Sequence, residues 1–133
     1  MAVYAAMIDR MDQGIGKIVA KLKQLDIDEN TIIMFLSDNG GCAEFLAEDT
    51  LYPMPGQYSS PTRDGNPMKV GNHRDTRPGA ENTFMSYDLP WANASNSPFR
   101  LFKRWTHEGG ISTPFIINWP SGIKTSSIVH DPT

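Results

Sequence analysis

The sequence predicts an α/β protein, because an amphipathic helix is followed by one buried strand and, much later, by a second strand. Apolar residues recur at steps of three and four between residues 2 and 25, as on one face of an α-helix. Residues 31–36 form a continuous apolar run rich in β-branched side chains. Such a run is typical of a strand buried on both faces, and we therefore expect this strand to be parallel to its neighbours.

The helix expected over residues 2–25 carries its apolar side chains on one face and most of its lysines and arginines on the other. Gly14 and Gly16 fall inside it, and each should cost about 1 kcal/mol relative to alanine. We expect close approach of a sheet to compensate for this cost. The apolar positions are Ile8, Met11, Ile15, Ile18, Leu22 and Leu25.

The second strand is expected at residues 113–119, where an apolar run ends at Pro120. Between the two strands, residues 37–100 are rich in Gly, Pro, Asn, Asp and Ser and contain no long periodic segment. A stretch of this length without regular structure is unusual in a compact domain and is commonly functional or disordered. One helix and two strands are too few to close an α/β core. We therefore expect residues 1–133 to be part of a larger sheet domain.

Composition excludes several classes of partner. The net charge is −3 and no basic cluster is present, so the sequence lacks the basic stripe that a nucleic-acid backbone requires. No segment approaches the roughly 20 apolar residues of a membrane-spanning helix.

The single cysteine, Cys42, cannot form an internal disulfide. Its surroundings offer no group that would activate the thiol, and we expect it to be a small packed residue.

A first candidate site directly follows the first strand, at the end of a sheet where α/β proteins bind their ligands. The residues are Ser37, Asp38, Asn39, Gly40 and Gly41. The Asp38 carboxylate and the Asn39 amide oxygen are ligands that Ca²⁺ and Mg²⁺ prefer. The same pentapeptide could instead be an ordinary turn that ends the strand.

A second candidate site lies just before the second strand. Arg100, Lys103 and Arg104 are followed by His107, a combination suited to an anionic group. His107 could bind the anion or donate a proton to a leaving oxygen. Composition alone also allows a solvated basic turn in which Trp105 covers apolar surface.

Taken together and in this order, the motifs resemble those of the type I sulfatases, most closely the bacterial arylsulfatases. The resemblance covers residues 2–123. It is carried by the helix at residues 4–12, by the turn at residues 37–41, and by the segments Trp-Ala-Asn-Ala-Ser-Asn-Ser-Pro-Phe-Arg at 91–100 and Thr-His-Glu-Gly-Gly-Ile-Ser-Thr-Pro at 106–114.

The resemblance implies an alkaline-phosphatase-like α/β fold and the hydrolysis of sulfate esters. It implies Asp38 and Asn39 as two ligands of a Ca²⁺ ion that binds the sulfate. It also implies Lys103 as the lysine that contacts the sulfate, with His107 in the same anion pocket. The substrate would be a small sulfate ester or a sulfated glycan, because phenolic, steroid and polysaccharide sulfates all fit the family.

The family's nucleophile is a formylglycine made from cysteine or serine, and we expect it upstream of this chain. Cys42 stands in Cys-Ala-Glu and does not fit the family motif Cys-x-Pro-x-Arg. We expect neither this motif nor its serine form, Ser-x-Pro-x-Arg, within the chain. We therefore expect residues 1–133 to be the C-terminal part of a catalytic domain that lacks the nucleophile-bearing N-terminal half, inactive by itself. Because bacterial relatives are typically periplasmic or secreted, we expect the same location for the intact enzyme.

Two alternatives remain open at this stage. The first is a phosphatase or phosphonate monoester hydrolase of the same superfamily, which the segment around residues 91–114 disfavours. The second is a non-catalytic remnant that keeps the anion pocket without the nucleophile. The sequence does not indicate the oligomeric state.

Overall fold

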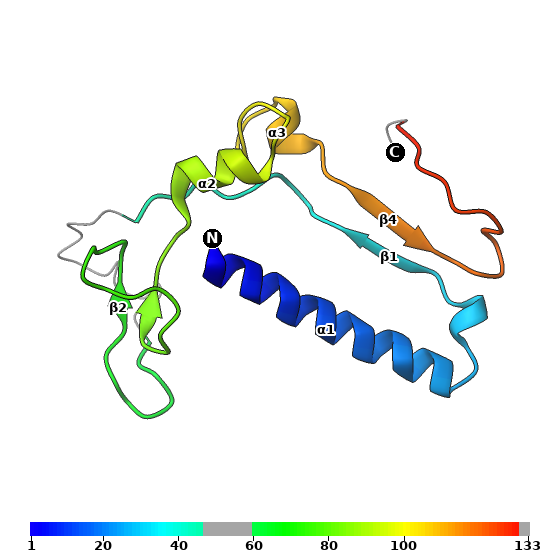
Figure 1. The fold of residues 1–133 in the computed structure, drawn as a ribbon, viewed down its shortest axis with the longest axis horizontal. Coiled ribbons are helices and arrows are strands. Elements are labelled where there is room, and N and C mark those ends of the chain that lie inside the picture. Colours follow the sequence, from blue (N-terminus) through cyan, green and yellow to red (C-terminus); the bar gives the residue numbers. More distant parts are fainter. Residues whose placement is uncertain (47–59, 131–133) are drawn as a thin grey trace. The chain divides into compact units, whose positions relative to one another are not determined.

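The computed structural model describes residues 1–46 and 60–130. The chain divides into two compact units. The first contains Met1–Met7 and Asp38–Thr113, and the second contains Ile8–Ser37 and Pro114–Thr133. The elements in chain order (Figure 1) are α1 (Ala2–Gln24), the 3₁₀ turn η1 (Asp28–Asn30), β1 (Ile33–Leu36), β2 (Lys69–Val70), β3 (Thr83–Phe84), α2 (Asp88–Ser95), α3 (Glu108–Ile111) and β4 (Phe115–Asn118).

Helix α1 confirms the expected amphipathic helix and ends at a well-formed cap. Asp26 has a left-handed backbone with φ of 53°. The N–H of Ile27 donates to the carbonyl of Leu22, and the N–H of Asp26 donates to the carbonyl of Lys23. This pair of bonds is a Schellman motif, which satisfies carbonyls that the last helical turn leaves free.

One expectation about α1 is wrong for the described residues. A Cβ built on Gly14 or Gly16 meets nothing within 4 Å. The described part of the chain therefore has no close approach of a sheet at these glycines. Their cost in helix stability is not offset by packing here.

Strands β1 and β4 confirm the two expected strands, but they pair antiparallel. Ile33 lies opposite Asn118, and Leu36 lies opposite Phe115. The expectation of a parallel neighbour is therefore wrong for this pair, because an apolar run can indicate burial but not the direction of the partner strand. Burial on both faces is also missing among the described residues, with Met34 and Ile116 each 59% exposed.

The first unit holds regular structure that the sequence analysis did not expect between residues 37 and 100. Strands β2 and β3 pair parallel over two residues, and α2 runs for eight residues. A helix this short has too few turns to produce a clear apolar period. Pro90 is tolerated because it lies in the first turn, where the backbone N–H has no helical partner. Ala92 of α2 is the fully buried apolar residue of the described chain.

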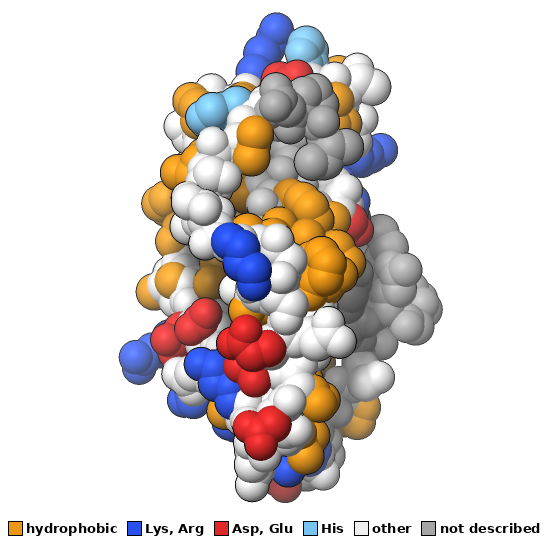
Figure 2. All heavy atoms as spheres, turned by 90° about the vertical axis from the view of Figure 1, so that its right-hand side faces the viewer, with side chains coloured by type: hydrophobic (Ala, Val, Ile, Leu, Met, Phe, Trp, Pro, Cys, Tyr) orange, Lys and Arg blue, Asp and Glu red, His pale blue; other side chains and the backbone are white. Residues whose placement is uncertain are grey.

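Charged side chains of both signs are intermixed on the face drawn in Figure 2, with hydrophobic side chains between them. Among the described helices, none has the length and apolarity needed to cross a bilayer.

Candidate functional site

The structure brings the two candidate sites together through their backbones. The N–H of Gly40 donates to the carbonyl of Gly110 at 3.0 Å, and the N–H of Lys103 donates to the carbonyl of Gly41 at 3.1 Å. The turn that follows β1 is therefore joined at two points to the segment that carries Lys103 and His107. All these residues belong to the first unit.

Two glycines make this close approach possible. A Cβ on Gly40 would overlap the carbonyl group of Gly109. A Cβ on Gly109 would in turn overlap the carbonyl oxygens of Arg100 and Leu101. Gly109 is itself buried and donates its N–H to the carbonyl of Arg100 at 3.0 Å. Main chain packs on main chain here, which explains the glycines of both motifs sterically.

Asn96 is a third link between the two segments, and the sequence analysis did not single it out. Its Oδ1 accepts from the N–H of Gly41 at 2.9 Å, and its Nδ2 donates to the carbonyl of Leu101 at 2.9 Å. Asn96 lies just after the last residue of α2. A polar residue between a short helix and a Ser-Pro pair carries no distinctive sequence signal, so only the contacts identify it.

The backbone around Lys103 is held in an unusual conformation. Leu101 and Arg104 have φ values of 69° and 89°, in the left-handed region that non-glycine residues rarely adopt. Each such residue costs about 1 to 3 kcal/mol and persists only where its surroundings enforce it. The hydrogen bonds of Asn96 and Gly109 to this segment supply part of that constraint.

The four predicted site residues differ in accessibility. Asp38 and His107 are exposed, whereas Asn39 and Lys103 are half-buried. His107 is the residue before α3, and its carbonyl accepts from the N–H of Gly110 at 2.7 Å. Because the carbonyl of Gly110 also accepts from the N–H of Gly40, the turn that contains His107 adjoins the turn after β1.

The oxygen donors of Asp38 and Asn39 fit a hard cation such as Ca²⁺, though they can supply only part of its shell. Ca²⁺ takes six to eight oxygen ligands. Within the described chain, no three His, Cys, Asp or Glu residues cluster in a way that could hold a metal ion. A calcium site built on Asp38 and Asn39 therefore needs further oxygen ligands beyond these two side chains.

Tyr87 lies close to Gly41, where an added Cβ would overlap the Tyr87 hydroxyl oxygen. Its ring stacks on Tyr4 with centroids 4.9 Å apart and planes at 15°. Burial and the neighbouring Tyr4 raise the pKa of the Tyr87 phenol, while hydrogen bonds with Ser95 and with the backbone of Cys42 act in the opposite direction. Cys42 is half-buried and has a free thiol, consistent with its expected packing role.

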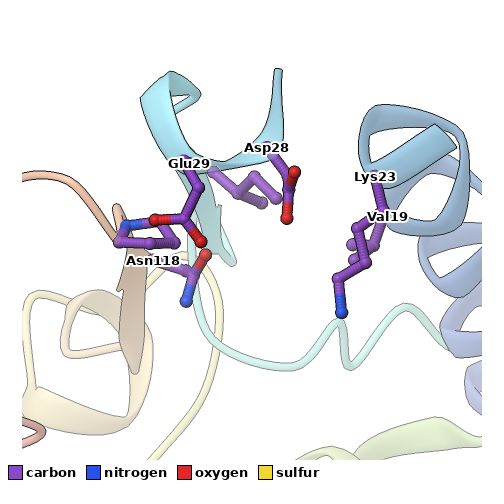
Figure 3. Close-up of a pocket in the computed structure, with 7 residues that line it drawn as sticks. Val19, Lys23, Asp28, Glu29 and Asn118 are labelled. Atoms are coloured by element: carbon purple, nitrogen blue, oxygen red, sulfur yellow. The ribbon is translucent and has the colours of Figure 1, made fainter. Parts of the chain in front are cut away.

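A separate pocket of about 390 Å³ lies within the second unit. In Figure 3, Val19 and Lys23 of α1 face Asp28, Glu29 and Asn118 from η1 and β4. The pocket is also lined by Ile33 and Pro120. The residues expected from the sequence to bind calcium or sulfate do not line it.

The expectation that the family's nucleophile motif is absent needs a correction. Residues 59–63 read Ser-Ser-Pro-Thr-Arg, which has the spacing Ser-x-Pro-x-Arg. The potential nucleophile, Ser59, lies outside the described residues. The pentapeptide also comes after Asp38 and Asn39, whereas the resemblance places the nucleophile before them. The motif therefore exists in the chain, but its position is not the one that the family resemblance implies.

Comparison with known proteins gives consistent matches. The family model described as Sulfatase matches residues 1–133. An arylsulfatase of Klebsiella aerogenes is 37% identical over 121 residues, covering 90% of this chain and 24% of that protein. An uncharacterized sulfatase of Schizosaccharomyces pombe is 35% identical over 128 residues, covering 96% of this chain and 21% of that protein.

A more distant relative is the N-acetylgalactosamine-6-sulfatase of Canis lupus familiaris, 27% identical over 96% of this chain and 16% of that protein. The chain thus spans about a quarter or less of the length of these three relatives. Because the family model covers every residue, these 133 residues belong to the sulfatase family.

Proposed function

We propose that the protein containing this chain hydrolyses sulfate esters, and that the chain supplies part of its calcium and sulfate site. The overall reaction adds water to a sulfate monoester and yields an alcohol or phenol and hydrogen sulfate. The family membership and the joined backbones of the two candidate sites support this proposal.

Asp38 and Asn39 would hold Ca²⁺ through their carboxylate and amide oxygens. When bound, the ion supplies positive charge that attracts the sulfate group and offsets charge on its oxygens. Asp38 is exposed and so is accessible to an ion, while half-buried Asn39 is better fixed in place. The remaining ligands and the formylglycine nucleophile would come from outside the described residues.

Lys103 would bind the sulfate oxygens with its ammonium group. A positive charge held where negative charge accumulates lowers the energy of the transition state more than that of the free substrate. His107 would share the same pocket, where it could bind the sulfate or give a proton to the leaving oxygen. Proton donation matters most for alkyl sulfates, because an alkoxide is a poorer leaving group than a phenoxide.

The observation that carries the proposal is the hydrogen bond from the N–H of Lys103 to the carbonyl of Gly41 at 3.1 Å. It fixes the start of the lysine side chain beside the turn that carries Asp38 and Asn39. A cation near a pair of hard-metal ligands would suit an oxygen-rich anion such as the singly charged sulfate group of a sulfate monoester. A solvated basic turn would not need this connection.

The relatives' names suggest two substrate classes. One relative is called an arylsulfatase and another an N-acetylgalactosamine-6-sulfatase. Because identity is higher to the arylsulfatase, at 37% against 27%, we propose an aryl sulfate as the first substrate to test and a sulfated glycan as the second.

The test compares hydrolysis of 4-nitrophenyl sulfate and 4-nitrophenyl phosphate by the full protein, with Ca²⁺ present and after its removal by a chelator. We expect calcium-dependent cleavage of the sulfate at a rate well above that of the phosphate. Preferential cleavage of the phosphate would favour the phosphatase alternative. No cleavage of 4-nitrophenyl sulfate, or of a sulfated glycan tested after it, would favour the non-catalytic remnant.

A further inference from the structure

We propose that Asn96 is a positioning residue that sets the Lys103 segment against the Asp38–Asn39 turn. This inference rests on the proposed function, because it assigns Asn96 a role in the same calcium and sulfate site. Asn96 itself would touch neither the ion nor the sulfate. It would act through the main chain on either side of the site.

Both ends of the Asn96 amide are used. Its oxygen accepts from the N–H of Gly41, and its nitrogen donates to the carbonyl of Leu101, each at 2.9 Å. The side chain is half-buried, so both bonds are partly shielded from water. A primary amide carries its acceptor and its donors on two separate atoms, so it can bond to groups on either side at once. Aspartate, alanine and serine cannot reproduce both bonds in this geometry.

The two bonded groups lie two residues from the residues that would do the chemistry. Gly41 is two positions after Asn39, and Leu101 is two positions before Lys103. Asn96 therefore joins the metal-ligand turn to the sulfate-binding segment at points close to both sets of proposed ligands. A change in either hydrogen bond would therefore displace Asn39 or Lys103, because each lies only two positions along the chain from a bonded group.

Leu101 makes this position sensitive. Its φ of 69° is one that a leucine adopts only under constraint. The Asn96 amide holds its carbonyl from one side, and the buried backbone of Gly109 packs close to the same carbonyl. Loss of the Asn96 bond would let Leu101 relax to a negative φ, which would turn the chain that leads to Lys103.

The experiment uses Asn96→Ala and Asn96→Asp in the full protein, with Asn93→Ala as the matched control. Asn93 is exposed on α2, the helix that Asn96 follows, and lies outside the proposed site. Asn96→Asp has nearly the same shape and keeps the acceptor for Gly41, but it loses the donor to Leu101. It therefore separates the two bonds even if the alanine variant folds poorly.

Two measurements are made well below the thermal midpoint of each variant. The first is hydrogen exchange of the peptide that contains Gly41, followed by mass spectrometry. The second is kcat and KM for 4-nitrophenyl sulfate. Misplacement of a catalytic group by about 1 Å can cost roughly 100-fold in rate, and we expect kcat to fall between roughly 10-fold and 100-fold in both Asn96 variants.

Asn96→Ala should also speed exchange at Gly41, whereas Asn96→Asp should leave that amide protected while still lowering kcat. Asn93→Ala should match the wild type in both measurements. A general loss of stability would not produce this split. Unchanged exchange at Gly41 in Asn96→Ala, or wild-type kcat in Asn96→Asp, would overturn the proposal.

The two proposals fail in distinguishable ways. If the wild-type protein cleaves no sulfate ester, the proposed function fails, and the exchange measurement still decides whether Asn96 holds the turn at Gly41. If the wild-type protein is active and both Asn96 variants keep its kcat, only the positioning role fails.

Discussion

The side-chain oxygen of Asn96 accepts a hydrogen bond from the backbone N–H of Gly41 at 2.9 Å, although 55 positions separate the two residues. Together with the bond from Lys103 N–H to the Gly41 carbonyl, it makes Gly41 the point where the turn after β1 meets the lysine segment. The proposed calcium ligands and the proposed sulfate ligand thus come from distant parts of the chain. Their relation is fixed mainly by main-chain contacts.

Replacing Lys103 by alanine should lower kcat for an aryl sulfate by about 100-fold or more, because a preorganised charge on the transition state is lost. The thermal midpoint should change little, since the ammonium group serves the sulfate and not the core. Steady-state kinetics and a melting curve of the full protein check both points. Lys17→Ala, on an exposed position of α1, is the control. Wild-type kcat in Lys103→Ala would remove the proposed role.

Replacing Asp38 by alanine should weaken calcium binding by the full protein, because one charged oxygen ligand is removed from the shell. Asp38→Asn should have a smaller effect, since an amide oxygen still binds the ion without the charge. Calorimetric titration with Ca²⁺ measures the affinity directly. The exposed Asp12 of α1 provides the control variant Asp12→Asn. Equal affinities for wild type and Asp38→Ala would mean that the metal assignment is wrong.

Gly40→Ala and Gly16→Ala should move stability in opposite directions. A Cβ at Gly40 would overlap the Gly109 carbonyl group, and such overpacking costs about 1 to 3 kcal/mol. A Cβ at Gly16 meets nothing within 4 Å and should stabilise α1 by about 0.5 to 1 kcal/mol. Thermal midpoints of the two variants test the pair. A neutral Gly40→Ala would show that the backbone approach at Gly109 is looser than the structure indicates.

Ser59 should remain an unmodified serine in the mature protein. It stands in the spacing Ser-x-Pro-x-Arg but follows Asp38 and Asn39 in the chain, opposite to the order that the family resemblance implies. Conversion of serine to formylglycine removes two hydrogens, so the peptide containing Ser59 would lose about 2 Da. Mass spectrometry of that peptide distinguishes the two forms. Detection of the lighter form would identify Ser59 as the nucleophile and would show that the nucleophile lies within this chain and not upstream of it.

The sequence by itself determined the elements with strong local signals and the family. Helix α1 and strands β1 and β4 follow from apolar periodicity and β-branched runs, which depend only on neighbouring residues. Family membership follows from motifs that are contiguous in the chain. The same motifs identify Asp38, Asn39, Lys103 and His107 as candidates.

Only the tertiary structure decided the antiparallel pairing of β1 with β4, the short helix α2 and the link through Asn96. An apolar run indicates that a strand is covered, but the direction of its partner depends on the path of the intervening chain. A helix of eight residues is too short for its period to stand out. The contact of Asn96 with Gly41 joins residues with no local relation, and such contacts exist only once the backbone has closed around them.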